Sequence, residues 1–265
     1  MKYIILDTET TSTLDDRKIT QLGFLVLDES FEIIEKFEAN GFAEEKYFDI
    51  DAMAATGITP EMVKDCSPIE RRTLWGKLES LNVPENVIIA HNSDFDMIAL
   101  KNHGFENKMQ VVDSYSISKH LRGEIINGKV QKHSLQYMRY FYKTYLIEHR
   151  EGYNISAHNA ISDCISLYYV IKEVFINGYD KSIQELIELS KKKYYDKYMY
   201  VGKRYNAWND MRDGKEPVTL EWIANNDRSY LQYILSNFTN LREDYQRSFV
   251  HYLTKSEQDD DGLPF

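Results

Sequence analysis

Short apolar runs broken by turn residues dominate the first 40 residues of the chain. Residues 2–6 (KYIIL) form one such run, and residues 19–27 and 31–38 flank the turn-like segment 28–30 (DES). Short runs bounded by polar residues predict strands, and two runs joined by a tight turn predict a hairpin. We therefore expect three adjacent strands of one sheet at the start of the fold.

After residue 60 the apolar residues recur with helical spacing between shorter apolar runs. Residues 87–90 (VIIA) and 111–113 (VVD) predict two further strands. The helical spacing predicts helices over roughly 60–81, 95–102, 133–143, 161–176 and 181–199. Strands that come early and later alternate with helices predict an α/β fold, with a mixed sheet flanked by helices.

The last third of the chain has a different pattern. Residues 201–217 are rich in Gly, Asn and Asp and predict a loop, whereas residues 219–254 have the spacing of helices around a small second core. We expect a first domain over residues 1–178, a small, mainly helical C-terminal region over 179–254, and an acidic mobile tail over 255–265.

The net charge of −10 argues against a nucleic-acid partner, because phosphate binding usually requires a basic surface. The charge is uneven, however, since residues 191–204 carry six Lys and Arg residues and one acid. The first residues lack the apolar core and cleavage site of a signal peptide, and no stretch reaches the roughly 18 apolar residues of a membrane helix. Two widely spaced cysteines, Cys66 and Cys164, form no metal motif. We expect a cytoplasmic protein that does not bind membranes.

Two acids directly follow the first predicted strand. Asp7 and Glu9 are two residues apart, so on a strand their carboxylates point to the same face. Strand ends are where open α/β sheets bind ligands. Two carboxylates this close resist joint ionisation, and a hard divalent cation with oxygen ligands relieves the repulsion. The alternative interpretation is a solvated loop that carries two acids.

A second polar cluster, AHNSDFD, follows the strand at 87–90 and opens a helix. Asp96 lies in the first helical turn, from which its carboxylate can point back to the strand ends. Asp94 competes for this role but suits the helix N-cap better. His91 is a candidate ligand or base, although a hydrogen-bonded histidine at a strand end is the plainer interpretation.

The third cluster, HNAISD, precedes an apolar helix. Residues five apart do not share a helical face, so we expect His158 on the loop before the helix and Asp163 in its first turns. Asp163 can then bind a metal while His158 acts as general base, because an imidazole titrates near neutral pH. The alternative is that Asp163 only complements the helix dipole.

In this order, the three clusters resemble the motifs of the DEDDh branch of the DnaQ-like exonucleases, a family that includes proofreading exonuclease subunits and exodeoxyribonuclease X. The matching motifs are DTETT, HNSDFD and HNAISD, and TGIT at residues 56–59 is similar to a segment that lies against the terminal nucleotide. The family often has Gly in place of Ser12 and His in place of Thr56. The resemblance covers roughly residues 1–178 and implies a ribonuclease H-like fold.

The resemblance also implies an activity, a 3′→5′ exonuclease that releases nucleoside 5′-monophosphates. It implies two divalent cations, Mg²⁺ or Mn²⁺, with Asp7 bridging both and His158 taking the proton from the attacking water. The metal ligands that it implies are Asp7, Glu9, Asp96 and Asp163. The residues expected to contact the terminal nucleotide are Thr10, Thr56, Ile58, Asn92 and Phe95.

Two features of the C-terminal region remain open in the sequence. Residues 191–204 interleave cations with aromatic residues, which suits single-stranded nucleic acid, but packed Tyr and solvated Lys residues would give the same pattern. Segments 202–204 and 227–235 also resemble a small C-terminal module of exodeoxyribonuclease X-like proteins.

The final residues, DDDGLPF, are similar to the acidic tip of bacterial single-stranded-DNA-binding proteins. That similarity implies a protein partner with a basic pocket for Leu263-Pro264-Phe265. A tail that aids solubility, or one that folds back on residues 191–204, fits the same sequence.

We expect the enzyme to act on DNA, on single strands or 3′ ends, in repair, recombination or replication. An RNA-trimming exonuclease would have the same metal site, because the choice depends on contacts to the 2′-hydroxyl. A hypothesis of another class is a non-catalytic module that binds nucleic acid or protein partners. The set of four acids and His158 argues against it, because a binding protein needs no such set.

Overall fold

The computed structural model of the chain describes residues 1–126, 129–238, 241 and 243–260. Contacts divide the chain into two compact units. Unit 1 contains residues 1–117 and 133–191, and unit 2 contains residues 118–132 and the chain from Lys192 onward. None of the helices in these described ranges is long and apolar enough to cross a membrane.

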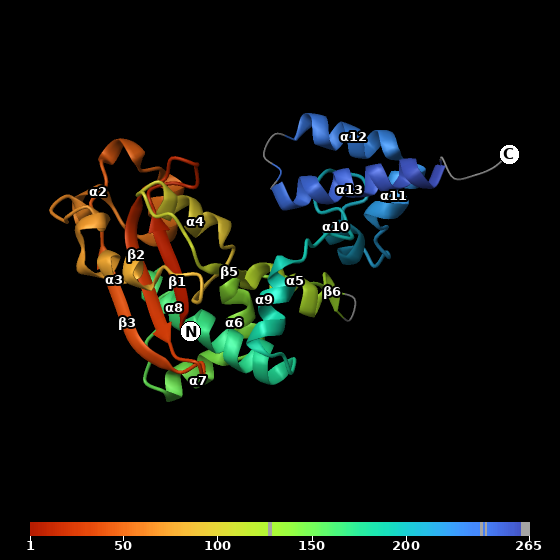
Figure 1. Ribbon diagram of the computed structural model, residues 1–265. Coiled ribbons are helices and arrows are strands. Elements are labelled where there is room, and N and C mark those ends of the chain that lie inside the picture. The colour runs from red at the N-terminus through yellow and green to blue at the C-terminus, as the bar shows by residue number, and fades with distance from the viewer. Residues whose placement is uncertain (127–128, 239–240, 242, 261–265) are drawn as a thin grey trace. The chain divides into compact units, whose positions relative to one another are not determined.

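Unit 1 is built on a five-stranded mixed sheet with the strand order β3-β2-β1-β4-β5 (Figure 1). Its strands are β1 (Tyr3–Thr10), β2 (Ile19–Leu27), β3 (Ile33–Asn40), β4 (Val87–Ala90) and β5 (Gln110–Asp113). β1 pairs antiparallel with β2 and parallel with β4, so β1 lies where the two halves of the sheet meet. The predicted mixed sheet is confirmed, and its central strand carries the first acidic motif.

One face of the sheet is covered by α3 (Thr73–Leu81) and α4 (Asp94–Lys101), which contact β3 and β1. Leu6 and Phe24, directly opposite each other on β1 and β2, are fully buried on this face with Trp75 of α3 and Leu100 of α4. The residues of β1 that alternate with Leu6, Asp7 and Glu9 among them, therefore point to the opposite face.

The opposite face is covered by α8 (Ala160–Tyr169), which continues as a π-helix over Val170–Gly178. Gly23 of β2 lies opposite Asp7 of β1, and a Cβ atom on Gly23 would come within 2.6 Å of the Ile161 backbone nitrogen. The missing side chain lets the first turn of α8 lie directly against the sheet. This close approach brings Asp163 of α8 next to the acids of β1.

The other helices of unit 1 are η1 (Glu45–Tyr47), α1 (Ile50–Thr56), α2 (Pro60–Val63), η2 (Ile69–Arg71), α5 (Ser114–Arg122), α6 (Leu135–Phe141), α7 (Thr144–Arg150) and α9 (Ile183–Lys191), with α5 running on into unit 2. The helical pattern predicted over 60–81 is divided into three pieces. Pro68 interrupts it because proline has no N–H to donate to a continuing helix.

Unit 2 consists of the short strands β6 (Ile125–Ile126) and β7 (Lys129–Val130) and the helices α10 (Ala207–Arg212), α11 (Leu220–Asn226), α12 (Arg228–Asn237) and α13 (Glu243–Asp260). Its core includes Leu220, Leu231 and Phe249. The segments 202–204 and 227–235 lie together here, because Arg204 forms an ion pair of 2.5 Å with Asp227.

The contacts differ from the predicted domain boundaries at three places, and one of them is that residues 118–132 belong to unit 2. Unit 1 extends to Lys191 instead of residue 178, because α9 packs against β5. α13 continues to Asp260, so residues 255–260 are helical and do not belong to the predicted mobile tail. The predicted docking segment Leu263-Pro264-Phe265 lies outside the described residues.

Candidate active site

Strand β1 presents Asp7 and Glu9 on the same face, as the spacing predicted. Glu9 is buried and Asp7 is half-buried. The register of β1 and β2 shifts between Glu9 and Thr10. Such an irregularity re-aims side chains at a strand end. Among the described residues, no hydrogen-bond donor contacts the carboxylate of Asp7 or that of Glu9, although neither side chain is fully exposed to water.

Asp96 reaches the cleft from α4 and is held there by Thr8. The Thr8 backbone N–H donates to Asp96 Oδ1 at 2.9 Å, and the Thr8 hydroxyl donates to the same oxygen at 2.7 Å. Thr8 lies between Asp7 and Glu9 and points to the other face of the sheet, where α4 packs. One strand therefore supplies two acids directly and positions a third.

Asp163 and His158 come from the start of α8, which is fixed to the sheet by polar contacts. Asn159 caps the helix by accepting from the Ser162 N–H, and Gln21 of β2 accepts from the Ala160 N–H at 2.9 Å. The His158 N–H donates to Asp163 Oδ2 at 2.9 Å. His158 has a φ of 57°, which turns the chain into the helix and leaves the imidazole exposed.

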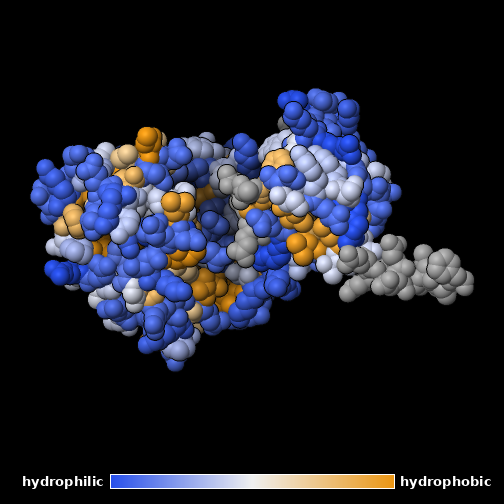
Figure 2. All heavy atoms as spheres, turned by 90° about the horizontal axis from the view of Figure 1, so that it is seen from above, coloured by the Kyte–Doolittle hydropathy of each residue, from blue (hydrophilic) through white to orange (hydrophobic). Residues whose placement is uncertain are grey.

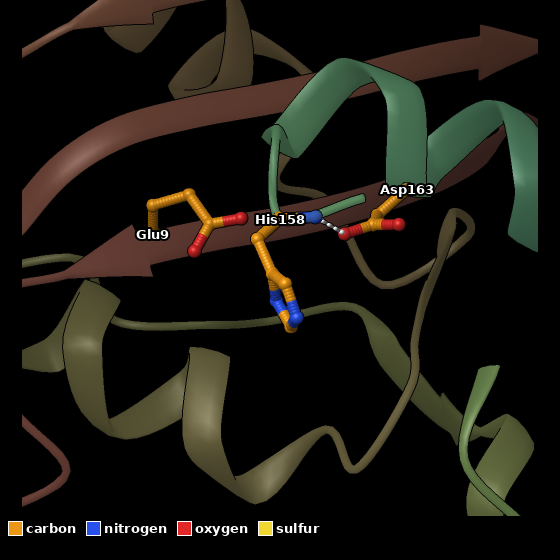
Figure 3. A group of neighbouring side chains, drawn as sticks. All are labelled: Glu9, His158 and Asp163. Atoms are coloured by element: carbon orange, nitrogen blue, oxygen red, sulfur yellow. Dashed lines mark hydrogen bonds between the residues drawn. The ribbon is translucent and has the colours of Figure 1, made fainter. Parts of the chain in front are cut away.

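These elements bring the predicted catalytic residues to one cleft of about 240 Å³. Ligand atoms of Glu9, His158 and Asp163 lie within 4.8 Å of one another, and Figure 3 shows the three side chains around the same space. The cleft is lined by Asp7, Thr8, Glu9, Thr10, Ser12, Thr13, Ala52, Ala55, Thr56, His91, Asn92, Phe95, Asp96, His158 and Asp163.

The four carboxylates are poorly suited to share this cleft without a cation. Burial raises the pKa of Asp7 well above its ordinary value, and the charges of Asp96, Glu9 and Asp163 raise it further. Burial, with the charges of Asp163 and Asp96, raises the pKa of Glu9 to about 7. Burial also raises the pKa of Asp96 to about 7, against the opposing hydrogen bonds from Thr8. The raised pKa values mean that these clustered carboxylates resist joint ionisation. A hard divalent cation, which prefers oxygen ligands, would relieve their repulsion.

Two residues that the sequence offered as alternative ligands or bases, His91 and Asp94, do not belong to the group of four acids and His158. His91 lines the cleft, but its Nδ1 lies 2.9 Å from Ser114 Oγ, and burial lowers its pKa to about 4, so the ring is neutral at neutral pH. The side chain of Asp94 is exposed and does not line the cleft. Asp94 is the first residue of α4, which shows no side-chain N-cap bond, so the predicted capping by Asp94 is wrong.

Four of the five expected nucleotide contacts line the cleft, namely Thr10, Thr56, Asn92 and Phe95. Ile58 does not, and its side chain is buried. The ring of Phe95 is backed by the buried guanidinium of Arg17, whose Cζ lies 4.3 Å from the ring centroid. This contact fixes the orientation of the ring at the cleft wall.

Sequence reasoning missed the residues that hold the site in place. Asp113, at the end of β5, accepts from the Asn92 N–H at 2.8 Å and also caps α5 by accepting from the Tyr115 N–H. Gln136 of α6 donates to Asp163 Oδ1 at 2.7 Å. For Asp113 a signal existed, since an acid at a strand end before a helix is a typical N-cap. For Gln136 and Gln21 the sequence has no comparable signal.

Comparisons with known proteins agree with this geometry. The family model of the RNase_T exonucleases matches residues 4–171 of the chain. Among solved structures, the fold resembles Exonuclease X in complex with 5′-overhanging duplex DNA, with a TM-score of 0.53 and 18% identity over 71% of this chain and 99% of that chain. It also resembles E. coli Exonuclease I in complex with a dA16 oligonucleotide, with a TM-score of 0.51 and 18% identity over 71% of this chain and 42% of that chain.

No curated protein sequence matches the chain. Identities of this size to solved structures establish a shared fold and nothing more specific. The family model, however, covers well over half of the chain and spans all three acidic motifs. The protein therefore belongs to the exonuclease family, and the prediction of a DnaQ-like 3′→5′ exonuclease is confirmed.

Proposed function

We propose that the protein removes nucleoside 5′-monophosphates from the 3′ ends of DNA, with two divalent cations in the cleft, in repair, recombination or replication. The observation that carries this proposal is the convergence of four carboxylates and His158 on one cleft. The DNA complexes of Exonuclease X and Exonuclease I, which share this fold, favour DNA as the substrate.

The four acids would hold the cations, Mg²⁺ or Mn²⁺. Asp7 suits the shared position, because the charges of all three other acids act on its pKa. Both hydrogen bonds from Thr8 fall on Oδ1 of Asp96, so Oδ2 remains for a cation. When bound, the cations would offset the negative charge that develops on the phosphate during displacement.

His158 acts as the general base. Its imidazole is exposed to water, and its ring nitrogens reach the same space as the carboxylates of Glu9 and Asp163. The imidazole takes a proton from a water molecule as the water oxygen forms a bond to phosphorus. The bond from phosphorus to the 3′ oxygen of the preceding nucleotide breaks, and that oxygen keeps the electron pair and takes a proton from solvent. The products are a nucleoside 5′-monophosphate and a strand shortened by one nucleotide with a 3′-hydroxyl.

The wall of the cleft away from the acids would hold the terminal nucleotide. Phe95, backed by Arg17, presents a ring of fixed orientation against which a base or sugar can pack. Thr10, Thr56 and Asn92 supply polar groups nearby. The side chain of Ile58 is buried, so Ile58 would support this wall from the interior and would not contact the nucleotide directly.

RNA trimming is the alternative substrate choice, and a non-catalytic binding module is the alternative class. The first would use the same acids, so only the sugar preference separates it from the main proposal. The second gives no reason for four acids to share a cleft where the charges of three of them raise the pKa of Asp7.

A cleavage assay tests the proposal. DNA and RNA strands of one sequence, labelled at the 5′ end, are incubated with Mg²⁺ or Mn²⁺, and the products are separated by length. We expect a ladder that shortens from the 3′ end of DNA and is lost with Asp96→Asn and with His158→Ala. Faster cleavage of RNA would mean that RNA, not DNA, is the substrate. No shortening of either strand with any metal would overturn the catalytic proposal.

The chain offers matched controls for both variants. Asp94→Asn removes an exposed acid from the same helix two residues from Asp96, and His149→Ala removes an exposed histidine of unit 1 that does not line the cleft. Both should cleave like the wild type. Equal losses in Asp94→Asn and Asp96→Asn would show that the assay reads charge or folding and not the site.

A further inference from the structure

Unit 2 contains a surface pocket of about 340 Å³. It is lined by Tyr195, Arg247, Val250, His251, Thr254 and Lys255. The five residues from α13 recur at spacings of three and four, so they form one face of that helix. The opposite face packs Phe249 and Leu253 into the core of the unit. The pocket wall is thus the face of α13 that the core leaves uncovered.

The aromatic residues of the stretch 191–204 divide into two groups. The hydroxyls of Tyr194 and Tyr200 donate to Glu124 at 2.9 and 2.7 Å, so these residues hold the interior of unit 2 together. Tyr195 turns to the pocket instead, where its ring stacks on His251 with a centroid distance of 3.8 Å and an interplanar angle of 12°. Only part of the aromatic pattern in this stretch is therefore structural.

The described lining of the pocket contains two cationic side chains and no acid. Arg247 is half-buried and makes no hydrogen bond or ion pair with any residue whose side chain is described. Lys255 pairs with Glu221 at 2.5 Å, and both side chains are about half exposed, so the ammonium also faces solvent. The nearby acid of the stretch, Asp196, is buried and paired with Lys119, so it does not neutralise the pocket.

We propose that this pocket binds a single strand of nucleic acid, with phosphate oxygens at Arg247 and Lys255 and a base against the stacked Tyr195 and His251 rings. Cations beside a flat aromatic surface are the combination that holds single strands without sequence preference. Val250, 53% exposed, adds an apolar contact for a base or sugar, and Figure 2 shows that apolar patches reach the surface of each unit. An acidic peptide would use the cations but would have no need of the rings.

The proposal rests on the proposed function, because it assigns a second contact to the strand whose end is cleaved. A strand held by unit 2 stays tethered to the same chain as the cleft, which raises its effective concentration there. We therefore expect the pocket to increase affinity for long strands.

The test measures binding of a fluorescent oligothymidylate by anisotropy in EDTA, where cleavage does not occur. Arg247→Gln should weaken binding about fivefold and reduce the slope of log Kd against log salt concentration by about one. Tyr195→Leu should weaken binding roughly tenfold through lost stacking. The controls Arg212→Gln and Tyr233→Leu change an exposed cation and an exposed ring of the same unit that lie outside the pocket, and should bind like the wild type.

If Arg247→Gln bound with the affinity and salt dependence of the wild type, the proposal would be overturned. An equal loss of affinity in Arg247→Gln and Arg212→Gln would overturn it too. Arg247→Gln removes only a charge, so it keeps the test decisive if Tyr195→Leu unfolds. Because the assay reads binding alone, its result stands whether or not the protein cleaves DNA. A failure of the proposed function would appear separately, as absent cleavage with intact binding.

Discussion

Each unit contains buried carboxylates, but those of unit 2 compared here have donors or a cation as partners, whereas Asp7 and Glu9 of unit 1 have no hydrogen-bond donor among the described residues. In unit 2, Glu124 accepts from the hydroxyls of Tyr194 and Tyr200, and Asp196 lies 2.9 Å from the ammonium of Lys119. In unit 1, the charged neighbours that act on Asp7 and Glu9 are other acids of the cleft. Burial is similar in the two places, and the chemistry of the neighbours is opposite.

The pKa shifts show what this difference does. Burial raises the pKa of both Glu124 and Glu9. For Glu124, hydrogen bonds from the Lys197 N–H and the two tyrosines oppose the rise, whereas for Glu9 the charges of Asp163 and Asp96 add to it. Glu124, whose charge is opposed by donors, is a structural element. A buried acid among acids needs a ligand of opposite charge, and that distinguishes a site from a core.

The largest contrast should come from Asp7→Asn. This change removes the acid whose pKa is raised by the charges of all three other acids, so kcat/KM should fall about a thousandfold or more. It also removes like-charge repulsion, so the melting temperature in EDTA should stay the same or rise. Steady-state cleavage and thermal unfolding check the two halves. Retained activity, or a melting temperature several degrees lower in EDTA, would contradict the role of Asp7.

Lys119→Met should have the opposite balance of effects. It leaves the buried carboxylate of Asp196 without its cation, and breaking a buried pair in this way costs about 3–5 kcal/mol. Urea unfolding, followed by the fluorescence of the tryptophans in unit 2, measures this loss. Lys215→Met, an exposed lysine of the same unit, should change the free energy of unfolding by less than about 0.5 kcal/mol. If both variants unfold like the wild type, the acids of unit 2 are no better supported than those of unit 1.

The cleft should also make stability depend on pH and metal. Glu9 has a folded-state pKa of about 7, above the ordinary value for a glutamate, so the folded state binds the proton more tightly than the unfolded state. The resulting stabilisation is fully present below the unfolded pKa and is lost as pH rises through about 7. In EDTA, wild type should therefore melt lower relative to Glu9→Gln at pH 8 than at pH 5, by roughly 5 °C.

Added Mg²⁺ should reverse this trend in the wild type, because a cation competes with the proton for the same oxygens. The same titration in Glu9→Gln should show a smaller metal effect. A melting-temperature difference that does not change with pH, with or without metal, would mean that the Glu9 carboxylate is already compensated within the protein.

The sequence was sufficient to predict the sheet and the acids of the cleft, because both depend on local pattern. The alternation in β1 orients Asp7 and Glu9, and the positions of the helix starts place Asp96 and Asp163. The sequence could not predict that residues 118–132 join unit 2, because the periodicity around them gives no break within α5 and their partners lie far along the chain.

The residues that position the acids were equally out of reach. Thr8 and Asp96 are 88 residues apart, and the Gln21 contact with Ala160 spans 139 residues. Such bonds follow from how α4 and α8 pack on the sheet, and no local spacing encodes them. Thr8 is the clearest case, since it lies inside the first acidic motif and yet acts on an acid of the second motif.

Thr8→Val should give the smallest of these effects, and it tests the comparison between the units most finely. The hydroxyl of Thr8 is one of the few donors that reach the four acids of the cleft, and its hydrogen bond lowers the pKa of Asp96. Valine keeps the branched shape on the strand but loses the donor, so kcat/KM at neutral pH should fall about tenfold. Thr8→Ser, which keeps the hydroxyl, should retain most of the activity.

Since the lost bond raises the pKa of Asp96, the valine variant should need more Mg²⁺ and should recover toward the wild type as pH rises. A purely structural role for Thr8 would leave the pH and Mg²⁺ dependence unchanged, and Asp96 would then owe nothing to the hydrogen bond from the Thr8 hydroxyl.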